Sequence, residues 1–317
     1  MIKVVVFGYG HLGRWHVDKV VALKEEGLCE LVGVVDHHPE TKKKLSDKGI
    51  EVATFKSFEE CNVEYDAGII VTPTSTHFEL ASQLIAAKKH VFCEKPMTST
   101  YEEATQLKQM IEEAGIKLQV GHSERYHQIW PELKDKVDYF KGTPILRLER
   151  QAPFKGRATD VDVVQDLMIH DIDLMMFILG DRPISVEAFG KKQRTDKWDF
   201  VRALFKFNSG AVATISVGRN HTEEIRNFEV VNDFGCLQVD LFRRQLREAR
   251  SSATEESEFV VTKEYPPRDH LLEEQRLFYN SIAADERTVV NEEDGLNAVY
   301  VVEQVLNSLE LEKSVSW

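Results

Sequence analysis

The feature of the sequence that most constrains its fold is a glycine-rich turn near the N-terminus. An apolar run at residues 2–8, IKVVVFG, leads into Gly8-Tyr9-Gly10-His11-Leu12-Gly13, where a helical pattern opens. Gly8 permits a tight turn, Gly10 lets the backbone approach a pyrophosphate, and Gly13 permits close helix packing. The first helical turn, with His11 and Leu12, supplies amide donors and a dipole that favours an anion.

An acidic residue strengthens this interpretation. The next apolar run, CELVGVVD at residues 29–36, ends at Asp36, about where a carboxylate binds the ribose hydroxyls of an adenosine. The glycine spacing alone is also compatible with a plain strand-to-helix turn, but strand, helix and acid together predict a dinucleotide site. Because Asp36 repels a 2′-phosphate, NAD is favoured, although Lys42 to Lys44 keep NADP open.

Short apolar runs alternate with helical patterns from residue 2 to about residue 120. The runs lie at residues 2–8, 29–36, 67–73, 90–96 and 117–122, with helical patterns near 13–27, 39–48, 75–88 and 100–114. Uniformly apolar strands separated by helices are typical of a parallel sheet covered on both faces. Residues 1–121 are therefore expected to form a doubly wound α/β domain of the Rossmann type.

The pattern changes after residue 121. A helix at 161–179 precedes strand-like stretches at 184–192, 200–219, 227–241 and 258–265, helices near 268–284 and 292–310, and a polar loop at 250–258. Asn208-Ser209-Gly210 separates two alternating runs, as in a hairpin. Residues 122–317 are expected to form an α+β domain with a mostly antiparallel open sheet. Apolar strands such as AVATISV, residues 211–217, would favour a homodimer or homotetramer through the uncovered face.

Charge and composition exclude several classes of partner. A formal charge of −13 repels phosphate backbones and acidic lipids, so neither nucleic acid nor a membrane surface is expected. The cysteines and histidines lack the spacing of a metal site, so no metal is expected. The N-terminus enters the first strand without room for a signal peptide, and no run is long enough to span a membrane; the default expectation is cytoplasmic.

Polar residues gather at two further strand ends, at the sheet edge where ligands bind in such folds. The predicted cofactor contacts there are Thr72, Pro73, Thr74 and His77 from TPTSTH, and Glu94 and Lys95 from CEKPM. A lysine in such a loop is equally compatible with a plain surface charge.

A polar stripe marks the expected helix of the second region. In DVVQDLMIHDIDLMMFIL, residues 162–179, Asp162, Asp166, His170 and Asp173 recur at helical spacing and would share one face. The stripe alone does not distinguish a solvated surface from a substrate site.

The combination of GYGHLGRWH, TPTSTH, HVFCEKPM and DLMIHDIDL resembles the Gfo/Idh/MocA oxidoreductases over essentially the whole chain. The resemblance implies NAD(P)-dependent dehydrogenation of a CH–OH group by a dimer or tetramer. It also implies that Lys95, Asp166 and His170 surround the carbon that exchanges hydride with nicotinamide.

The chemistry of alcohol oxidation calls for such residues. A hydroxyl proton must leave with the hydride, and His170 is the predicted base because imidazole titrates nearest neutrality. Lys95 would stabilise the developing alkoxide, and Asp166 would orient ligand hydroxyls or the other two side chains. Asp162 is expected to be a charge at the helix N-terminus. Asp173 is expected to be a solvated or interface carboxylate, with a contact to His170 left open.

Two segments resemble the branch of this family that dehydrogenates UDP-N-acetylglucosamine at C3. They are GHSERYHQIWPEL, residues 121–133, and FKGRATDVDVVQDLMIHDIDL, residues 154–174. A UDP-sugar carries two negative charges, and the cations available near the expected cleft are Arg125, Lys155 and Arg157. Arg125 and Arg157 are the predicted substrate contacts, beside Tyr126. Each arginine is equally compatible with an exposed or structural charge.

Two alternatives remain at this point. One is a dehydrogenase of a free sugar or an inositol-like polyol, because the family handles many such substrates. The other is an NAD-binding sensor without turnover, which would have no chemical need for Lys95 together with Asp166 and His170.

Overall fold

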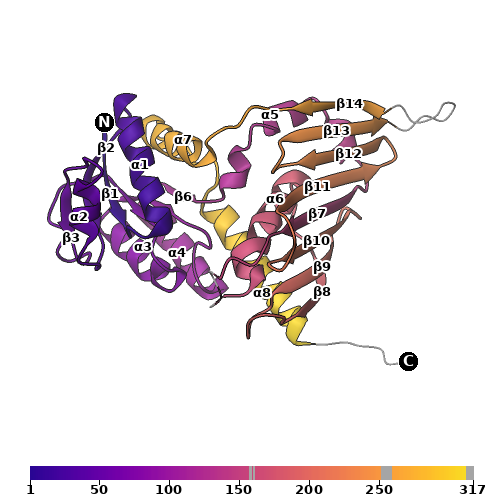
Figure 1. The fold of residues 1–317 in the computed structure, drawn as a ribbon, viewed down its shortest axis with the longest axis horizontal. Coiled ribbons are helices and arrows are strands. Elements are labelled where there is room, and N and C mark those ends of the chain that lie inside the picture. The colour runs from indigo at the N-terminus through magenta and orange to yellow at the C-terminus, as the bar shows by residue number, and fades with distance from the viewer. Residues whose placement is uncertain (157–158, 160, 251–258, 312–317) are drawn as a thin grey trace. The chain divides into compact units, whose positions relative to one another are not determined.

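The computed structural model describes residues 1–156, 159, 161–250 and 259–311 (Figure 1). Contacts divide the chain into two compact units. Unit 1 comprises Met1–Ser123 and Asp269–Val299, and unit 2 comprises Glu124–Arg268 and the chain from Tyr300 onward. The sequence predicted a single boundary at residue 121. The two units differ from this division because residues 269–299 belong to unit 1.

Unit 1 is built on a parallel sheet of six strands in the order β3-β2-β1-β4-β5-β6. The strands are β1 (Ile2–Phe7), β2 (Cys29–Val35), β3 (Ala53–Phe55), β4 (Ala67–Ile70), β5 (His90–Cys93) and β6 (Leu118–Val120). The helices between them are α1 (His11–Glu25), α2 (Thr41–Ser46), η1 (Thr74–Thr76), α3 (His77–Ala86) and α4 (Tyr101–Ala114). The predicted doubly wound Rossmann sheet is confirmed.

The core of unit 1 explains why the late helix α7 (His270–Ala284) belongs to it. Val17, Val20 and Leu23 recur on one face of α1 at helical spacing and pack against the apolar strands. Phe278 and Tyr279 of α7 join the same buried cluster. Burying two large aromatic side chains holds α7 to unit 1, because removing such apolar area from water is strongly favourable.

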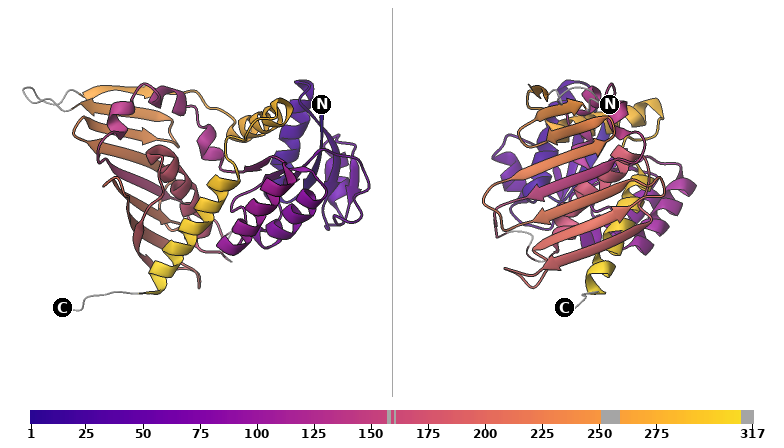
Figure 2. Two further views of the ribbon diagram at one scale, coloured as in Figure 1. Left: turned by 180° about the vertical axis from the view of Figure 1, so that it is seen from behind. Right: turned by 90° about the vertical axis from the view of Figure 1, so that its right-hand side faces the viewer.

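Unit 2 is built on an eight-stranded sheet in the order β14-β13-β12-β11-β7-β10-β9-β8, seen face-on in Figure 2. The strands are β7 (Ile145–Gln151), β8 (Ser185–Lys191), β9 (Phe200–Lys206), β10 (Val212–Gly218), β11 (Ile225–Asn232), β12 (Gly235–Asp240), β13 (Gln245–Arg250) and β14 (Phe259–Glu264). All neighbouring pairs are antiparallel except β7 and β10, which confirms a mostly antiparallel sheet. The predicted hairpin at Asn208–Gly210 joins β9 to β10.

Short helices and two longer ones complete unit 2. They are η2 (Ser123–Tyr126), α5 (Trp130–Leu133), η3 (Val137–Phe140), η4 (Val164–Met168), α6 (Ile169–Leu179) and the later part of α8 (Glu292–Glu310). Helix α6 covers one face of the sheet at β7 and β10. Ala213, Ile215 and Val217 of β10 are buried, whereas Thr214 and Ser216 alternate onto the open face.

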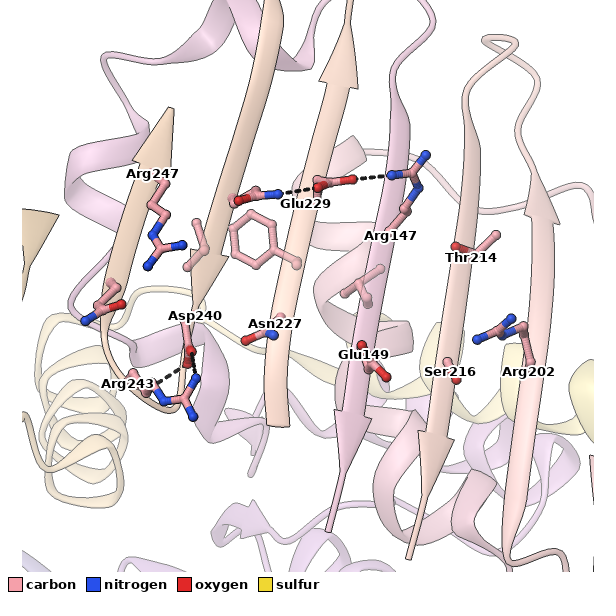
Figure 3. Close-up of a pocket in the computed structure, with 15 residues that line it drawn as sticks. Arg147, Glu149, Arg202, Thr214, Ser216, Asn227, Glu229, Asp240, Arg243 and Arg247 are labelled. Carbon is pink, nitrogen blue, oxygen red and sulfur yellow. Dashed lines mark hydrogen bonds and ion pairs between the residues drawn. The ribbon is translucent and has the colours of Figure 1, made fainter. Parts of the chain in front are cut away.

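The open face of this sheet is therefore polar, and the expectation of an apolar face around residues 211–217 is wrong. Figure 3 shows Arg147, Glu149, Arg202 and Glu229 projecting from neighbouring strands into a broad hollow. Period-two alternation sends the apolar half of AVATISV to the covered face.

The stretch expected as one regular helix at 161–179 has two parts. Residues 164–168 form a wider π-helical turn, η4, before the α-helix α6 begins. The π turn alters the helical spacing within residues 164–168, whereas the Asp166 amide still donates to the Asp162 carbonyl oxygen at 3.0 Å, as in an α turn. Asp162 accepts the Trp198 amide proton through Oδ1 at 2.7 Å. In the part of the chain that the structure describes, no helix is both long and apolar enough to cross a membrane.

Candidate functional site

The glycine turn of unit 1 is fixed by its own backbone. Gly8 has a φ of +97°, and a Cβ there would lie 2.7 Å from the Val71 carbonyl oxygen. A Cβ on Gly13 would lie 2.1 Å from the Gly8 carbonyl oxygen. A side chain at either position would therefore push strand and helix apart.

Gly10 differs from the other two glycines. It is exposed at the start of α1, and a Cβ on it would meet nothing within 4 Å. The space over this backbone is open, and it lies at the N-terminus of a helix, where amide groups and the helix dipole favour an anion. His11 is exposed and Leu12 half-buried beside it. These residues fit the pyrophosphate of a dinucleotide.

Asp36 follows β2 and links two segments. Its Oδ2 accepts the Tyr9 amide proton at 2.5 Å, and its Oδ1 accepts the His38 amide proton at 2.7 Å. These bonds fix the carboxylate next to the glycine turn. Each carboxylate oxygen can accept a further hydrogen bond, so ribose hydroxyls can still be bound.

The ends of β4 and β5 are joined by His77. Its Nδ1 lies 2.8 Å from the Pro96 carbonyl oxygen and its Nε2 lies 2.9 Å from the Thr72 carbonyl oxygen. Burial lowers the pKa of His77, although both carbonyl groups and the charge on Glu94 oppose the shift. The buried His77 side chain therefore links the two loops. Within the first loop, the Thr76 hydroxyl donates to the Thr72 hydroxyl oxygen at 2.7 Å.

Of the remaining predicted residues in these loops, Pro73 is exposed and Thr74 and Lys95 are half-buried. Glu94 is different, because it is buried and its Oε1 lies 2.9 Å from Nε2 of His16. Sequence reasoning missed His16. The available signal was its position on the buried face of α1, three residues after Gly13.

In unit 2, Asp166 lies in η4 and His170 in α6, and both are half-buried. Asp173 is fully buried and pairs with both ends of the Arg125 fork, at 2.7 and 2.8 Å. The Arg125 guanidinium also lies 4.8 Å from the centre of the Phe177 ring. Asp173 is therefore not the solvated carboxylate that was expected, and Arg125 is held in a buried ion pair.

A small hollow of about 80 Å³ adjoins Asp166. It is lined by four cationic and two acidic side chains, among other residues: Arg150, Lys155, Arg219 and Arg226, with Asp166 and Glu224. Sequence reasoning missed all the arginines of this set, because strands far apart in sequence bring them together. Of the other predicted substrate residues, Tyr126 is buried, and Arg157 lies outside the described residues.

The cations of this hollow are of two kinds. Arg150 is buried between Asp171 and Glu124; burial opposes its charge, but these carboxylates hold the pKa of Arg150 above its usual value. Arg219 is likewise buried and pairs with an aspartate at 2.7 Å. Lys155 and Arg226 have side chains that are 48% and 42% exposed, and both pair with Glu224.

No group of three or more potential metal ligands is arranged to hold a metal ion within the described ranges of the chain.

Comparisons with known proteins agree with this geometry. Residues 2–122 match the model of the oxidoreductase family with an NAD-binding Rossmann fold, and residues 139–238 match the Gfo/Idh/MocA C-terminal domain. The chain belongs to the Gfo/Idh/MocA oxidoreductase family. It is thus an NAD-binding dehydrogenase of the kind that acts on CH–OH groups.

Several members of the family are similar over much of the chain. A UDP-N-acetylglucosamine 3-dehydrogenase of Acidithiobacillus ferrooxidans is 36% identical over 245 residues, which cover 77% of this chain and 76% of that protein. A solved structure of that enzyme matches with a TM-score of 0.87 and 33% identity over 98% of both chains. A myo-inositol 2-dehydrogenase of Thermotoga maritima is 26% identical over 331 residues, 99% of this chain and 98% of that one.

Proposed function

We propose that this oxidoreductase uses NAD to oxidise a secondary hydroxyl of a UDP-linked N-acetylhexosamine, at C3 of UDP-N-acetylglucosamine. The observation that carries the proposal is the cation-lined hollow beside Asp166. A UDP-sugar brings two phosphate charges that such cations would bind, whereas an inositol brings none. The similarity to the Acidithiobacillus enzyme supports the same substrate class.

The cofactor-binding residues are those of the sheet edge in unit 1. The open backbone at Gly10 would receive the pyrophosphate, and Asp36 would accept the ribose hydroxyls. A 2′-phosphate would be repelled by the Asp36 carboxylate, so the proposed cofactor is NAD rather than NADP. Bound NAD would supply the hydride acceptor.

The remaining chemistry falls to three side chains. His170 takes the hydroxyl proton, because imidazole is the side chain best suited to general-base catalysis near neutral pH. The ammonium group of Lys95 stabilises the negative charge that develops on the oxygen. Asp166 orients the sugar hydroxyls through its carboxylate.

The proposed diphosphate ligands are Lys155 and Arg226. Their side chains are the more exposed cations of the hollow, and they share one carboxylate, Glu224, which the diphosphate would displace. Arg226 also pairs with Glu124 at 3.3 Å. The other two cations, Arg150 and Arg219, are buried and already paired with carboxylates, so they are not proposed as diphosphate ligands. Arg125 is likewise committed to Asp173.

The test is turnover by the purified protein, followed by the absorbance of reduced nicotinamide. We expect reduction of NAD with UDP-N-acetylglucosamine and much less reduction of NADP. His170→Ala and Lys95→Ala proteins should lose most of this rate. Turnover with myo-inositol or glucose, and none with UDP-sugars, would replace the proposal with a dehydrogenase of free polyols, an activity that the Thermotoga relative suggests.

We also propose that the protein is a homodimer or homotetramer that associates through the open face of the eight-stranded sheet. This face carries both signs of charge, including Arg147 paired with Glu229 and Arg243 paired with Asp240. A surface with interspersed charges can be complementary to a second copy of itself. Sedimentation should give an oligomer for the wild type and smaller species for Arg202→Glu. A monomeric wild type would contradict this.

A further inference from the structure

A chain of buried polar groups lies behind Lys95 in unit 1. His16 of α1 and Gln275 of α7 are fully buried, and Glu94 is 7% exposed. The chain runs from the Tyr279 hydroxyl through Gln275 and His16 to Glu94, with contacts of 3.2, 2.9 and 2.9 Å. Buried polar groups are costly unless each is paired, so such a chain fixes the side chains that it links.

The bonds of Gln275 determine the tautomer of His16. Because the Tyr279 hydroxyl donates to Gln275 Oε1, the amide nitrogen of Gln275 faces His16. That nitrogen donates to the His16 carbonyl oxygen at 3.3 Å and to Nδ1 at 2.9 Å. A ring nitrogen that accepts carries no proton, so the proton of His16 is on Nε2. His16 therefore donates to Glu94.

The carboxylate of Glu94 is held on three sides. Oε1 accepts from His16, and Oε2 accepts the Lys95 amide proton at 3.2 Å. Gly121 closes the third side, because a Cβ there would lie 2.7 Å from Oε1. Glu94 thus sets the main chain of the residue that carries the proposed catalytic ammonium.

The surroundings keep a single negative charge on Glu94. Burial opposes ionisation, but the hydrogen bond from His16 and the positive charge of Lys95 lower the pKa of Glu94 below its usual value. Burial and the Glu94 charge raise the pKa of Glu274, which favours the neutral form of its carboxyl group. The titratable groups that interact with Glu94 are Cys93 of β5, Lys95, His16 of α1, His77 of α3 and Glu274 of α7.

We propose that Glu94, oriented by His16 and Gln275, is a positioning residue for Lys95. It fixes the Lys95 backbone by a hydrogen bond and supplies the counter-charge of the Lys95 ammonium group. The inference rests on the proposed catalytic role of Lys95. A residue that acts in this way controls the rate of the chemical step more than substrate binding.

The test compares Glu94→Gln with the wild type in steady-state turnover. We expect kcat to fall by about tenfold or more, because the Lys95 ammonium group loses its counter-charge and its proposed catalytic position is held less precisely, with KM for both substrates changed less than about threefold. The alkaline limb of the kcat profile should move to lower pH, since one negative charge next to the Lys95 ammonium is gone. The matched control is Glu30→Gln, which removes an exposed partner of Lys24 and should leave kcat unchanged.

Two further variants separate positioning from a purely structural role. Gln275→Leu removes the hydrogen-bond donor to Nδ1 of His16. This variant should lose less kcat than Glu94→Gln, with a pH shift in the same direction, and it keeps the test available if Glu94→Gln does not fold. His16→Leu and Glu94→Gln should be non-additive in kcat, because the two residues act in series. If Lys95→Ala is inactive while folded Glu94→Gln and Gln275→Leu proteins keep the wild-type kcat and pH profile, this inference alone is overturned. A fully active Lys95→Ala protein would overturn the proposed role of Lys95 itself.

Discussion

Two alanine substitutions in the glycine turn should affect different properties of the protein. In Gly13→Ala, the new methyl group would lie 2.1 Å from the Gly8 carbonyl oxygen, so the two backbone segments must separate by more than about 1 Å to reach ordinary contact. In Gly10→Ala, the φ of −71° is one that L residues adopt, and the methyl group meets no protein atom within 4 Å. The first substitution should damage the fold, and the second should damage cofactor binding.

The expected sizes follow from these distances. Overpacking of this kind costs about 1–3 kcal/mol, and replacing glycine by alanine inside a helix returns about 1 kcal/mol. Because the methyl group would meet backbone at 2.1 Å, the overpacking cost lies at the upper end of this range, and Gly13→Ala should lose about 2 kcal/mol, or a few degrees of Tm. Gly10→Ala should change the free energy of unfolding by less than about 1 kcal/mol, but its methyl group occupies the proposed pyrophosphate position. Its Kd for NAD should rise by about tenfold or more, which corresponds to about 1.4 kcal/mol.

Thermal unfolding by circular dichroism and calorimetric titration with NAD measure the two quantities. Each variant is the control for the other, since both add the same methyl group to the same turn. Wild-type affinity for NAD in Gly10→Ala would refute the pyrophosphate site. A wild-type Tm in Gly13→Ala would refute the close strand-to-helix contact.

Three other predictions concern buried charges and the substrate. Burial raises the pKa of Glu274. Protonated Glu274 therefore contributes to the free energy of unfolding at low pH, and this contribution is lost as the pH rises from the usual carboxyl range toward the raised pKa. Glu274→Gln should therefore unfold like the wild type near about pH 5 and be more stable near about pH 8 in urea titrations; an equal difference at both pH values would contradict this. Arg125→Met should lower the free energy of unfolding by about 3–5 kcal/mol, because it strands the buried Asp173 carboxylate; intact stability with a raised KM would instead make Arg125 a substrate ligand. Lys155→Met and Arg226→Met should each raise KM for UDP-N-acetylglucosamine by about tenfold, because each loses one charged hydrogen bond. The Kd for NAD should not change. An unchanged KM would show that these residues are not part of the substrate site.

The sequence predicted unit 1 well because its signals are local. Glycines at fixed spacing, apolar strands and Asp36 all lie within one strand–helix–strand unit, where a period and a distance along the chain suffice. The strand β3 was missed because three residues, Ala53–Phe55, carry too little pattern. The place of α7 was missed because only tertiary packing of Phe278 and Tyr279 reveals it.

The polar parts of unit 2 were predicted less well. Strand β7 was missed because Arg147 and Glu149 interrupt its apolar pattern, as expected of a strand with one polar face. The Arg125–Asp173 pair joins residues 48 positions apart, and no local spacing announces such a partner. For the same reason, the sequence pointed to Arg125 and Arg157 rather than to the arginines that β7 and β11 bring next to Asp166.

The most direct test of the proposed function compares UDP-N-acetylglucosamine with free N-acetylglucosamine in the same NAD-reduction assay. The two differ only in the UDP group, so the ratio of their kcat/KM values measures the contribution of the uridine diphosphate. Two charged contacts of about 1.5–3 kcal/mol each predict at least about a hundredfold preference for the UDP-sugar. Equal kcat/KM values, or turnover of the free sugar alone, would contradict a site built for a sugar nucleotide.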